Sequence, residues 1–304
     1  MDFIQKILDC HPLSGERGGL FAILESVLEK YDCEIKTDAL GNILFTKKFG
    51  KGKNILLCTG ADVSGVIAVY TEKSKIYVGA LGNVDVKRLS QSKVVFEGVS
   101  GIFTVPENAS RVDECYVETF DENVFEKVKQ GDKGYFDTPV YSLESGVCSG
   151  YGVPVKACVI TLLNWSKKLF EKDARQIIEA NGIGSVTVAF LGQSSLSSRG
   201  AFTASFNVQP DEIILLSAIL EQNAKPSLDR HTQYAVKVLD KGFVCDEGFV
   251  KDVCRYFEEN DIKYQKVTSE EKSISLNALC RAESTPKAVE ICLPVFGKES
   301  VYLK

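Results

Sequence analysis

The chain has 304 residues, of which 44% are apolar and 25% are charged, so it is long enough to bury a large core and to form two domains. A formal net charge of -5 argues against a nucleic-acid partner, because proteins that bind nucleic acid gather Lys and Arg on one face. No apolar run approaches the roughly 20 residues needed to span a bilayer, so we expect no membrane insertion.

Cysteine usage indicates a reducing compartment. The chain has ten cysteines, but its first residues, "MDFIQKILDC", lack the basic segment and apolar core of a signal peptide. No pair of cysteines has Cys-x-x-Cys spacing, so neither a disulfide framework nor a zinc knuckle is indicated. We therefore expect a cytoplasmic protein whose cysteines are buried free thiols.

The predicted elements of the first part of the chain are two helices and three strands. Helices are predicted over 1–10 and 20–31 from apolar residues at helical spacing. The strands follow within 33–62 and are separated at Gly41 and at the turn of Gly50 and Gly52. The last strand, "NILLCTG", is apolar without alternation, which is typical of a strand buried on both faces.

Short strand-like runs follow, such as "VIAVY", "KIYVGALG", "VVFEGV" and "GIFTV", separated by Gly, Asn and Ser clusters. This pattern predicts a small β-barrel or sandwich over 66–145, with one helix over 122–130. In the rest of the chain, predicted helices and strands alternate again. Helices are predicted over 155–170, 172–181, 198–207 and 247–261, and strands over 185–192, 212–219, 234–240 and 288–294. The predicted fold class is therefore α/β, with a mixed sheet flanked by helices in a discontinuous domain of 1–65 and 146–304, and an inserted β-barrel domain of 66–145.

Four stretches, in order, resemble a known family: "SGERGGL", "DALGNILFTKKFGKGKNILLCTGADVSGVIAVY", "VKQGDKGYFD" and "VAFLGQSSLSSRGAFTASFNVQPDEIILL". They are similar to the glutamyl-aminopeptidase family of two-metal peptidases, which includes the tetrahedral aminopeptidases. The resemblance implies a zinc-peptidase-like (phosphorylase/hydrolase-like) domain interrupted by a barrel that mediates dimerisation. It also implies a homo-oligomer, or a subunit that joins a related peptidase, and a peptide ligand.

In that family a pair of zinc or cobalt ions shares a bridging aspartate and a water, and a glutamate acts as general base. The resemblance implies that Ser194 stands at the general-base position. The resemblance also implies which residues of this chain stand at the family's metal-ligand positions. Gly60 stands where the family has a histidine, and Asp62 stands where the family has the acid that orients this histidine. Pro154 or Val155 stands at the position of the bridging aspartate, Ser195 at that of a glutamate, and Ser217 at that of a further aspartate. Only Asp62 keeps the family's residue type. The two histidines, His11 and His231, lie in neither segment where the family places its histidine ligands.

These replacements predict a non-catalytic aminopeptidase-like protein, a pseudo-peptidase with a binding or assembly role and without a metal cofactor. Two alternatives stay open. One is a metal-dependent aminopeptidase that holds Zn or Co at an atypical site and releases N-terminal residues from peptides. The other is a hydrolase that uses Cys58 or a serine of the same cleft, although no histidine is predicted beside them.

Four single residues and one short segment are expected to have structural roles. Asp62 is expected to satisfy backbone donors at its strand end. Cys58 and Cys158 are expected to pack as small apolar residues. The segment from Arg199 to Ala201 is expected to form a backbone turn and to allow close packing of the helix that follows. His11 is expected at the surface or at a helix cap.

Overall fold

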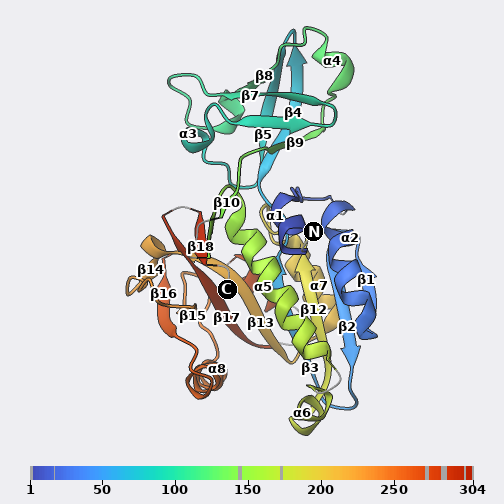
Figure 1. Cartoon of the computed structure of the whole chain (residues 1–304), viewed down its shortest axis with the longest axis vertical. Helices are drawn as coiled ribbons and strands as arrows, with labels where there is room; N and C mark the ends of the chain where they lie inside the picture. The colour runs from blue at the N-terminus through green and yellow to red at the C-terminus, as the bar shows by residue number, and fades with distance from the viewer. Residues whose placement is uncertain are drawn as a thin grey trace.

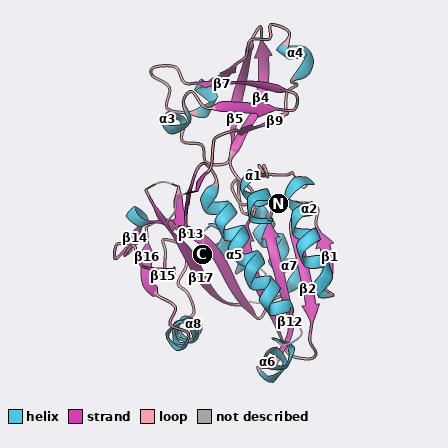
Figure 2. Cartoon of the chain, viewed as in Figure 1, coloured by secondary structure: helices cyan, strands magenta, loops and turns pink. Residues whose placement is uncertain are grey.

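The computed structural model describes residues 3–16, 18–142, 146–171, 174–270, 274–281, 286–297 and 299–302. These residues form a large α/β layer with a smaller barrel standing on it (Figures 1 and 2). Twelve strands of the described residues make the mixed sheet, and nine of them follow the order β1-β2-β12-β3-β13-β17-β15-β16-β14. Their bounds are β1 (Glu34–Thr37), β2 (Ile43–Lys48), β3 (Lys53–Gly60), β12 (Ile183–Leu191), β13 (Glu212–Leu220), β14 (Ala224–Lys225), β15 (Tyr234–Leu239), β16 (Tyr264–Ser269) and β17 (Lys287–Phe296). The short strands β10 (Tyr141–Ser142), β11 (Val147–Ser149) and β18 (Ser300–Tyr302) attach beside β17.

The centre of the sheet is parallel. Strands β12, β3, β13 and β17 pair with one another in parallel, whereas β2 and β15 flank them in antiparallel orientation. The central strands are apolar on both faces, and β17 is buried along nearly its whole length. Because parallel strands end at the same edge of a sheet, the carboxyl ends of these four strands come together there.

Helices cover both faces of the sheet (Figure 1). The longest, α5 (Val153–Phe170), packs on β3 and β13, and α1 (Phe3–Asp9) and α2 (Gly18–Leu28) pack beside it. On the opposite face, α7 (Arg199–Val208) packs against α9 (Ile274–Leu279). The remaining helices of the layer are α6 (Ala174–Ala180) and α8 (Glu247–Glu259).

The predicted barrel is confirmed as a closed six-stranded ring in the order β4-β5-β8-β7-β6-β9. Its strands are β4 (Gly65–Glu72), β5 (Lys75–Leu81), β6 (Lys93–Phe96), β7 (Val99–Thr104), β8 (Tyr116–Glu118) and β9 (Lys133–Phe136). Buried Val and Phe side chains such as Val94, Phe103 and Phe136 fill its interior. Closure removes free strand edges, which explains how such short strands form a stable unit.

Two details of the insert differ from the sequence predictions. The helix predicted over 122–130 is a single turn, α4 (Val124–Lys127), because Lys129 N donates to the Asp132 carboxylate and the chain turns there. A further short helix, α3 (Val86–Leu89), was not predicted; the Asp85 side chain caps it. Residues 143–145, at the predicted end of the insert, lie outside the described residues, so the domain division stays a prediction.

A helix that crosses a bilayer needs about 20 predominantly apolar residues. None of the helices of the described residues is long and apolar enough to cross a membrane.

Candidate functional site

A cavity of about 440 Å³ lies at the carboxyl ends of the parallel strands. Every site position predicted from the sequence contributes to its wall, although these positions are far apart along the chain. They are Gly60, Asp62, Pro154, Val155, Ser194, Ser195 and Ser217. The edge of a parallel sheet is a common place for ligand sites, so this cavity is the candidate functional site.

Asp62 is held by the two serines across the cavity. Its Oδ1 accepts hydrogen bonds from the Ser194 backbone N, at 2.8 Å, and from the Ser194 hydroxyl. Its Oδ2 accepts from Ser195 N at 3.3 Å and from Ser195 Oγ at 2.6 Å. A carboxylate has about four lone-pair sites, so these donors saturate an Asp62 side chain that is only 5% exposed. The acceptor role expected for Asp62 holds, but its donors come from the loop after β12 rather than from its own strand end.

Gly60 and Ser194 compete for the same space. A Cβ atom added to Gly60 would lie 2.7 Å from Ser194 Oγ and 3.1 Å from Ser194 Cβ. The serine side chain, drawn toward Asp62, therefore occupies the space into which a side chain from position 60 would extend.

The first turn of α5 presents no ligand atom to the cavity. Pro154 and Val155 line the wall, and Val155 packs with the apolar cluster of Leu13 and Val63. Lys156 turns away, is buried, and donates from Nζ to the Leu8 carbonyl at 2.5 Å. Burial lowers the pKa of Lys156, and its contact ties α5 to α1.

A buried ion pair forms another part of the wall, and the sequence analysis missed it. Lys237 and Glu290 face each other across the antiparallel pair β15 and β17, with Nζ and Oε1 2.8 Å apart. Ser217 Oγ donates to the same Glu290 oxygen at 2.6 Å. Burial works to lower the pKa of Lys237, but the neighbouring Cys292 and Glu290 outweigh it and raise that pKa. A charged residue inside each of two apolar runs, "YAVKVLD" and "AVEICLP", was the available signal.

Glu299 closes the side of the cavity nearest the barrel. It follows β17 in the segment where the family resemblance places a histidine. Its carboxylate accepts from Arg88 of α3, at 2.7 Å, and from Gly152 N at 3.1 Å. Burial raises the pKa of Glu299, and Arg88 works in the opposite direction.

These residues do not fit a pair of divalent metal ions. Asp62 has no free acceptor site, while Glu290 and Glu299 are each engaged by a cation. Gly, Pro and Ser stand at the remaining positions, and a neutral serine hydroxyl does not offset the charge of a metal ion. Within the described ranges, no three His, Cys, Asp or Glu side chains are grouped so as to hold a metal.

The thiols and the imidazoles add no nucleophile or base to the cavity wall. Cys158 lines the cavity and Cys58 does not; burial raises the pKa of both, which keeps the thiols neutral. His11 is half-buried, and its ring stacks on Tyr135 of the barrel with centroids 4.3 Å apart. Burial lowers the pKa of His11 to about 4. His231 is exposed, and neither histidine is among the described residues that line the cavity.

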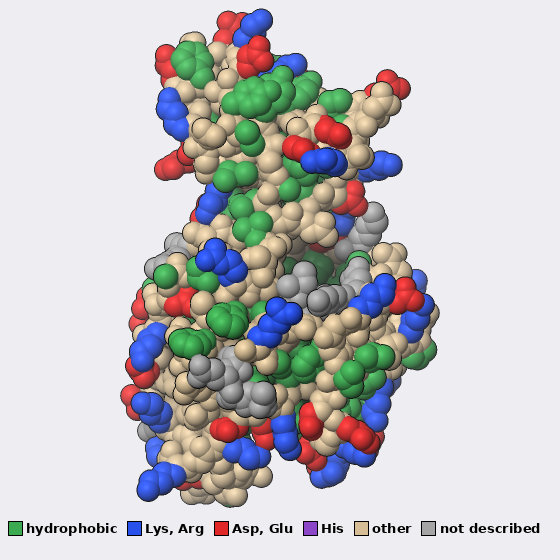
Figure 3. Space-filling view, turned by 180° about the vertical axis from the view of Figure 1, so that it is seen from behind, with side chains coloured by type: hydrophobic (Ala, Val, Ile, Leu, Met, Phe, Trp, Pro, Cys, Tyr) green, Lys and Arg blue, Asp and Glu red, His purple; other side chains and the backbone are tan. Residues whose placement is uncertain are grey.

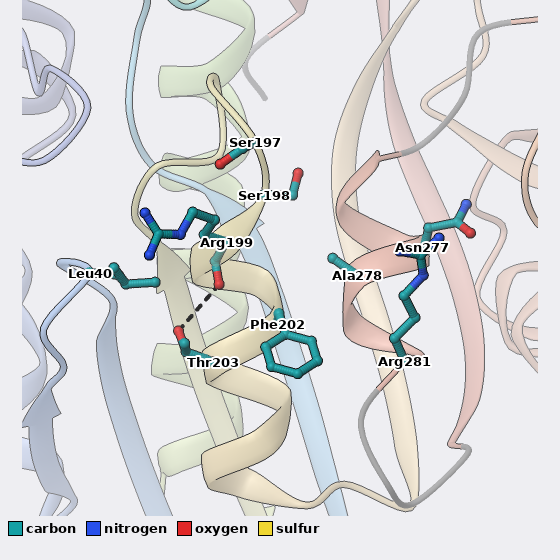
Figure 4. A pocket seen from close by; sticks show the side chains of 9 residues that line it. All are labelled: Leu40, Ser197, Ser198, Arg199, Phe202, Thr203, Asn277, Ala278 and Arg281. Atoms are coloured by element: carbon teal, nitrogen blue, oxygen red, sulfur yellow. Dashed lines mark hydrogen bonds between the residues drawn. The ribbon is translucent and has the colours of Figure 1, made fainter.

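A second pocket, of about 620 Å³, lies on the other face of the sheet between α7 and α9 (Figure 4). Phe202 faces the gap from α7, whereas the Arg199 side chain extends toward Leu40 and Arg281 lies beside Asn277. The two arginines thus lie on separate parts of the wall. Of the predicted site positions, none lines this pocket.

A parallel-centred sheet with its cavity at the strand ends, interrupted by a closed barrel, defines an α/β fold with a site of the kind that takes small ligands. The chain belongs to the M42 glutamyl aminopeptidase family, whose model matches residues 41–295.

Relatives agree with this assignment. The chain is 28% identical to a protein of Acetivibrio thermocellus that is provisionally named an aminopeptidase, over 87% of this chain and 81% of that protein. An aminopeptidase of the archaeon Desulfurococcus kamchatkensis has a similar fold, with a TM-score of 0.86, 18% identity, and coverage of 99% of this chain and 89% of that chain. The TET1 peptidase of Pyrococcus horikoshii, which assembles into a tetrahedron or an octahedral shell, gives a TM-score of 0.82 at 16% identity over 99% and 95% of the two chains. At these identities the structural likenesses establish the fold alone.

Proposed function

We propose that this protein is a non-catalytic member of the M42 family, a pseudo-peptidase that acts by binding or assembly. The observation that carries the proposal is the bonding of Asp62, whose four acceptor sites are taken by Ser194 and Ser195. A carboxylate in that state neither binds a metal ion nor orients a ligand to one. The position proposed for the general base holds a serine, which is not deprotonated at neutral pH and so cannot accept a proton from water.

The assembly part of the proposal is a cytoplasmic homo-oligomer, or a subunit that joins a related peptidase, formed through the barrel. Large apolar side chains are exposed on the barrel, namely Val69, Tyr70, Ile102, Phe120 and Phe125. Figure 3 displays hydrophobic side chains gathered over the barrel. Exposed apolar groups of this kind favour association. The Pyrococcus horikoshii peptidase assembles into a tetrahedron or a large octahedral shell, which supports a homo-oligomer here.

A second candidate is a metal-dependent aminopeptidase with an atypical site. The specific observation in its favour is that Asp62, Glu290 and Glu299 all line the one cavity. Rearrangement of their present partners would expose three carboxylates, and carboxylate oxygens bind zinc and cobalt.

Metal analysis together with aminopeptidase assays separates the two candidates. The full chain is purified, dialysed against zinc, cobalt or manganese, analysed for bound metal by mass spectrometry, and assayed with leucine p-nitroanilide and with unlabelled peptides. The proposal expects no stoichiometric metal and no turnover above that of a buffer control.

Stoichiometric metal with turnover would overturn the proposal. In that event Asp62→Asn is the matched variant, because activity that originates in this cavity should fall with it, whereas activity of a contaminating peptidase should not.

A further inference from the structure

The pocket between α7 and α9 lies apart from the predicted site positions. Its volume is about 620 Å³, and its described lining comes from α7 and the two residues before it, from α9, from Arg281 just after α9 and from Leu40 (Figure 4). Small-molecule sites commonly measure about 300 to 1,000 Å³. The pocket is therefore large enough to hold a ligand with one or two rings.

The charged side chains that line this pocket are both cationic. Arg199 begins α7 and Arg281 follows α9, and both are exposed. The ion pairs formed by described arginines belong to other residues, namely Arg88, Arg111, Arg175 and Arg255. Neither guanidinium of the pocket therefore has an ion-pair partner in the described part of the chain. In a chain with a net charge of -5, two such cations at one pocket favour an anionic ligand.

An acid lies behind this wall, but its acceptor sites are occupied. Asp38 Oδ1 accepts from Leu40 N at 2.9 Å and from Asn42 N at 3.0 Å. Its Oδ2 accepts from Asn42 Nδ2 at 2.6 Å and from Thr203 Oγ1 at 3.0 Å. A carboxylate has about four lone-pair sites, so these donors saturate it. Asp38 is not among the lining residues, and its single negative charge leaves the two arginines in excess.

Phe202 supplies an aromatic surface between the two helices. Its ring is exposed on α7 and faces the gap toward α9 (Figure 4). Phe206, one turn further along α7, stacks beside it with ring centroids 6.5 Å apart but does not line the pocket. A lone exposed arginine is commonly solvated. Arginines that border an exposed ring instead match a ligand with both an anionic group and an aromatic body.

We propose that this pocket binds an aromatic carboxylate. The ligand ring lies on Phe202, and the carboxylate pairs with Arg281, which lies beside Asn277 on the α9 side of the gap (Figure 4). A guanidinium presents parallel N–H groups that match the two oxygens of a carboxylate. Arg199 extends toward Leu40 rather than toward α9, so it adds positive charge without a direct contact. This second site does not rest on the non-catalytic function proposed above.

The test measures the binding of naphthoate, its neutral isostere naphthamide and the cation naphthylmethylammonium to the full chain by isothermal titration calorimetry. We expect naphthoate to bind about tenfold or more tightly than naphthamide, because hydrogen bonds between charged groups are the stronger ones. We expect the ammonium ion not to bind. Equal affinities for naphthoate and naphthamide, or no saturable binding of naphthoate, would overturn the proposal.

Three arginine variants locate the carboxylate. Arg281→Gln should weaken naphthoate binding about tenfold or more and change naphthamide binding by less than about twofold. Arg199→Gln should cause a smaller loss, of about two- to threefold, because its charge acts through solvent. Arg230→Gln is the matched control, since Arg230 is exposed and outside the pocket lining, and it should leave binding unchanged. Unchanged naphthoate affinity in Arg281→Gln, or a larger loss in Arg199→Gln, would contradict the assignment.

Two phenylalanine variants test the ring contact. Phe202→Leu should weaken naphthoate binding about threefold or more, because stacking of two aromatic rings is lost. Phe206→Leu is the control on the same helix, exposed and outside the pocket lining, and should keep the affinity of the unchanged chain. Both side chains are exposed, so we expect both variants to fold, which circular dichroism verifies. Full affinity in a folded Phe202→Leu variant would show that the ring does not lie there.

This experiment and the metal assay fail independently. Of the described residues, Ser198 is the one that lines both pockets, so the two sites are largely separate. Bound metal with turnover would overturn the proposed function and leave naphthoate binding untouched. Absence of naphthoate binding would overturn this inference alone.

Discussion

At the scale of single residues, positions 60, 62 and 194 depend on one another. A side chain at position 60 would collide with Ser194, which lies where it does because its hydroxyl and amide both bond Asp62. Clustered carboxylates without cations repel one another and are costly to bury, so two serines beside one aspartate form a less costly arrangement. A change at one of these three positions would therefore disturb the other two.

The bonding of Asp62 predicts the effect of Asp62→Asn. An asparagine offers one acceptor oxygen, and its amide group would face the donors of Ser195. We expect the free energy of unfolding in urea to fall by about 2 kcal/mol. Asp246→Asn is the control, because Asp246 caps α8 by accepting from Phe249 N, and asparagine caps a helix equally well. Equal losses in both variants would count against the special role of Asp62.

The stacking of His11 on Tyr135 predicts a pH dependence. Burial lowers the pKa of His11 to about 4 in the folded chain, below the usual value of about 6.5 in an unfolded chain. Above pH about 6.5 both states hold a neutral ring and the stabilisation is complete. As the pH falls from about 6.5 to about 4, only the unfolded state takes up the proton, so the free energy of unfolding declines. The loss is at most about 3 kcal/mol, and it is smaller than this because solvent reaches the half-buried ring.

His11→Phe keeps a ring against Tyr135 and removes the titrating group. The loss of unfolding free energy between pH 7 and pH 4.5 should therefore be smaller in this variant than in the unchanged chain. His231→Gln, at an exposed position, is the control and should leave the slope as it was. Parallel slopes in all three proteins would show that His11 does not contribute.

At the scale of elements, the approach of α7 to the end of β12 depends on one glycine. A Cβ atom on Gly200 would lie 2.0 Å from Gly192 O and 2.5 Å from Asn42 Oδ1. The buried Asn42 joins the two segments, since its Nδ2 donates to Gly200 O and its Oδ1 accepts from Gly192 N, both at 2.8 Å. This contact confirms the expected packing role of the step from Arg199 to Ala201.

The same contact predicts that Gly200→Ala lowers the free energy of unfolding by about 3 kcal/mol, because backbone atoms on both sides must move apart. The measurement is the shift of the urea midpoint. Gly50→Ala is the matched control, since no heavy atom lies within 4 Å of a Cβ built there, and its effect should stay within about 0.5 kcal/mol. Comparable losses at the two positions would contradict this account.

The sequence predicted individual helices and strands but not the contacts between them. Apolar runs such as "NILLCTG" predicted the central strands, because a strand buried on both faces is apolar throughout and can be recognised from its own residues. The pair of Lys237 and Glu290 was missed because it depends on the register of β15 against β17, which neither strand encodes by itself. The contacts of Asp62 with residues some 130 positions away were missed for the same reason.

At the scale of the whole molecule, the order of the segments was more informative than any single motif. An α/β alternation interrupted by short strand-like runs predicted both the layer and the barrel, since each pattern has its own hydrophobic period. The cavity arises where strands from both halves of the chain end, with Arg88 of the barrel bonded to Glu299 beside it. The barrel therefore contributes to the surroundings of the site as well as to the exposed surface.

That exposed surface predicts the state of the protein in solution. We expect light scattering with size-exclusion chromatography to give a multiple of the 33.4 kDa chain mass. Val69 and Phe125 are 43% and 49% exposed on the barrel, and charges there would have to be desolvated in an interface. The double variant Val69→Asp/Phe125→Asp should therefore shift the measured mass toward that of one chain. Ile177→Asp is the control, because Ile177 is 68% exposed on α6, at the far end of the layer from the barrel (Figure 1), and it should leave the mass unchanged. A single-chain mass for the unchanged protein would remove the assembly role from the proposed function and leave the binding role to be tested by itself.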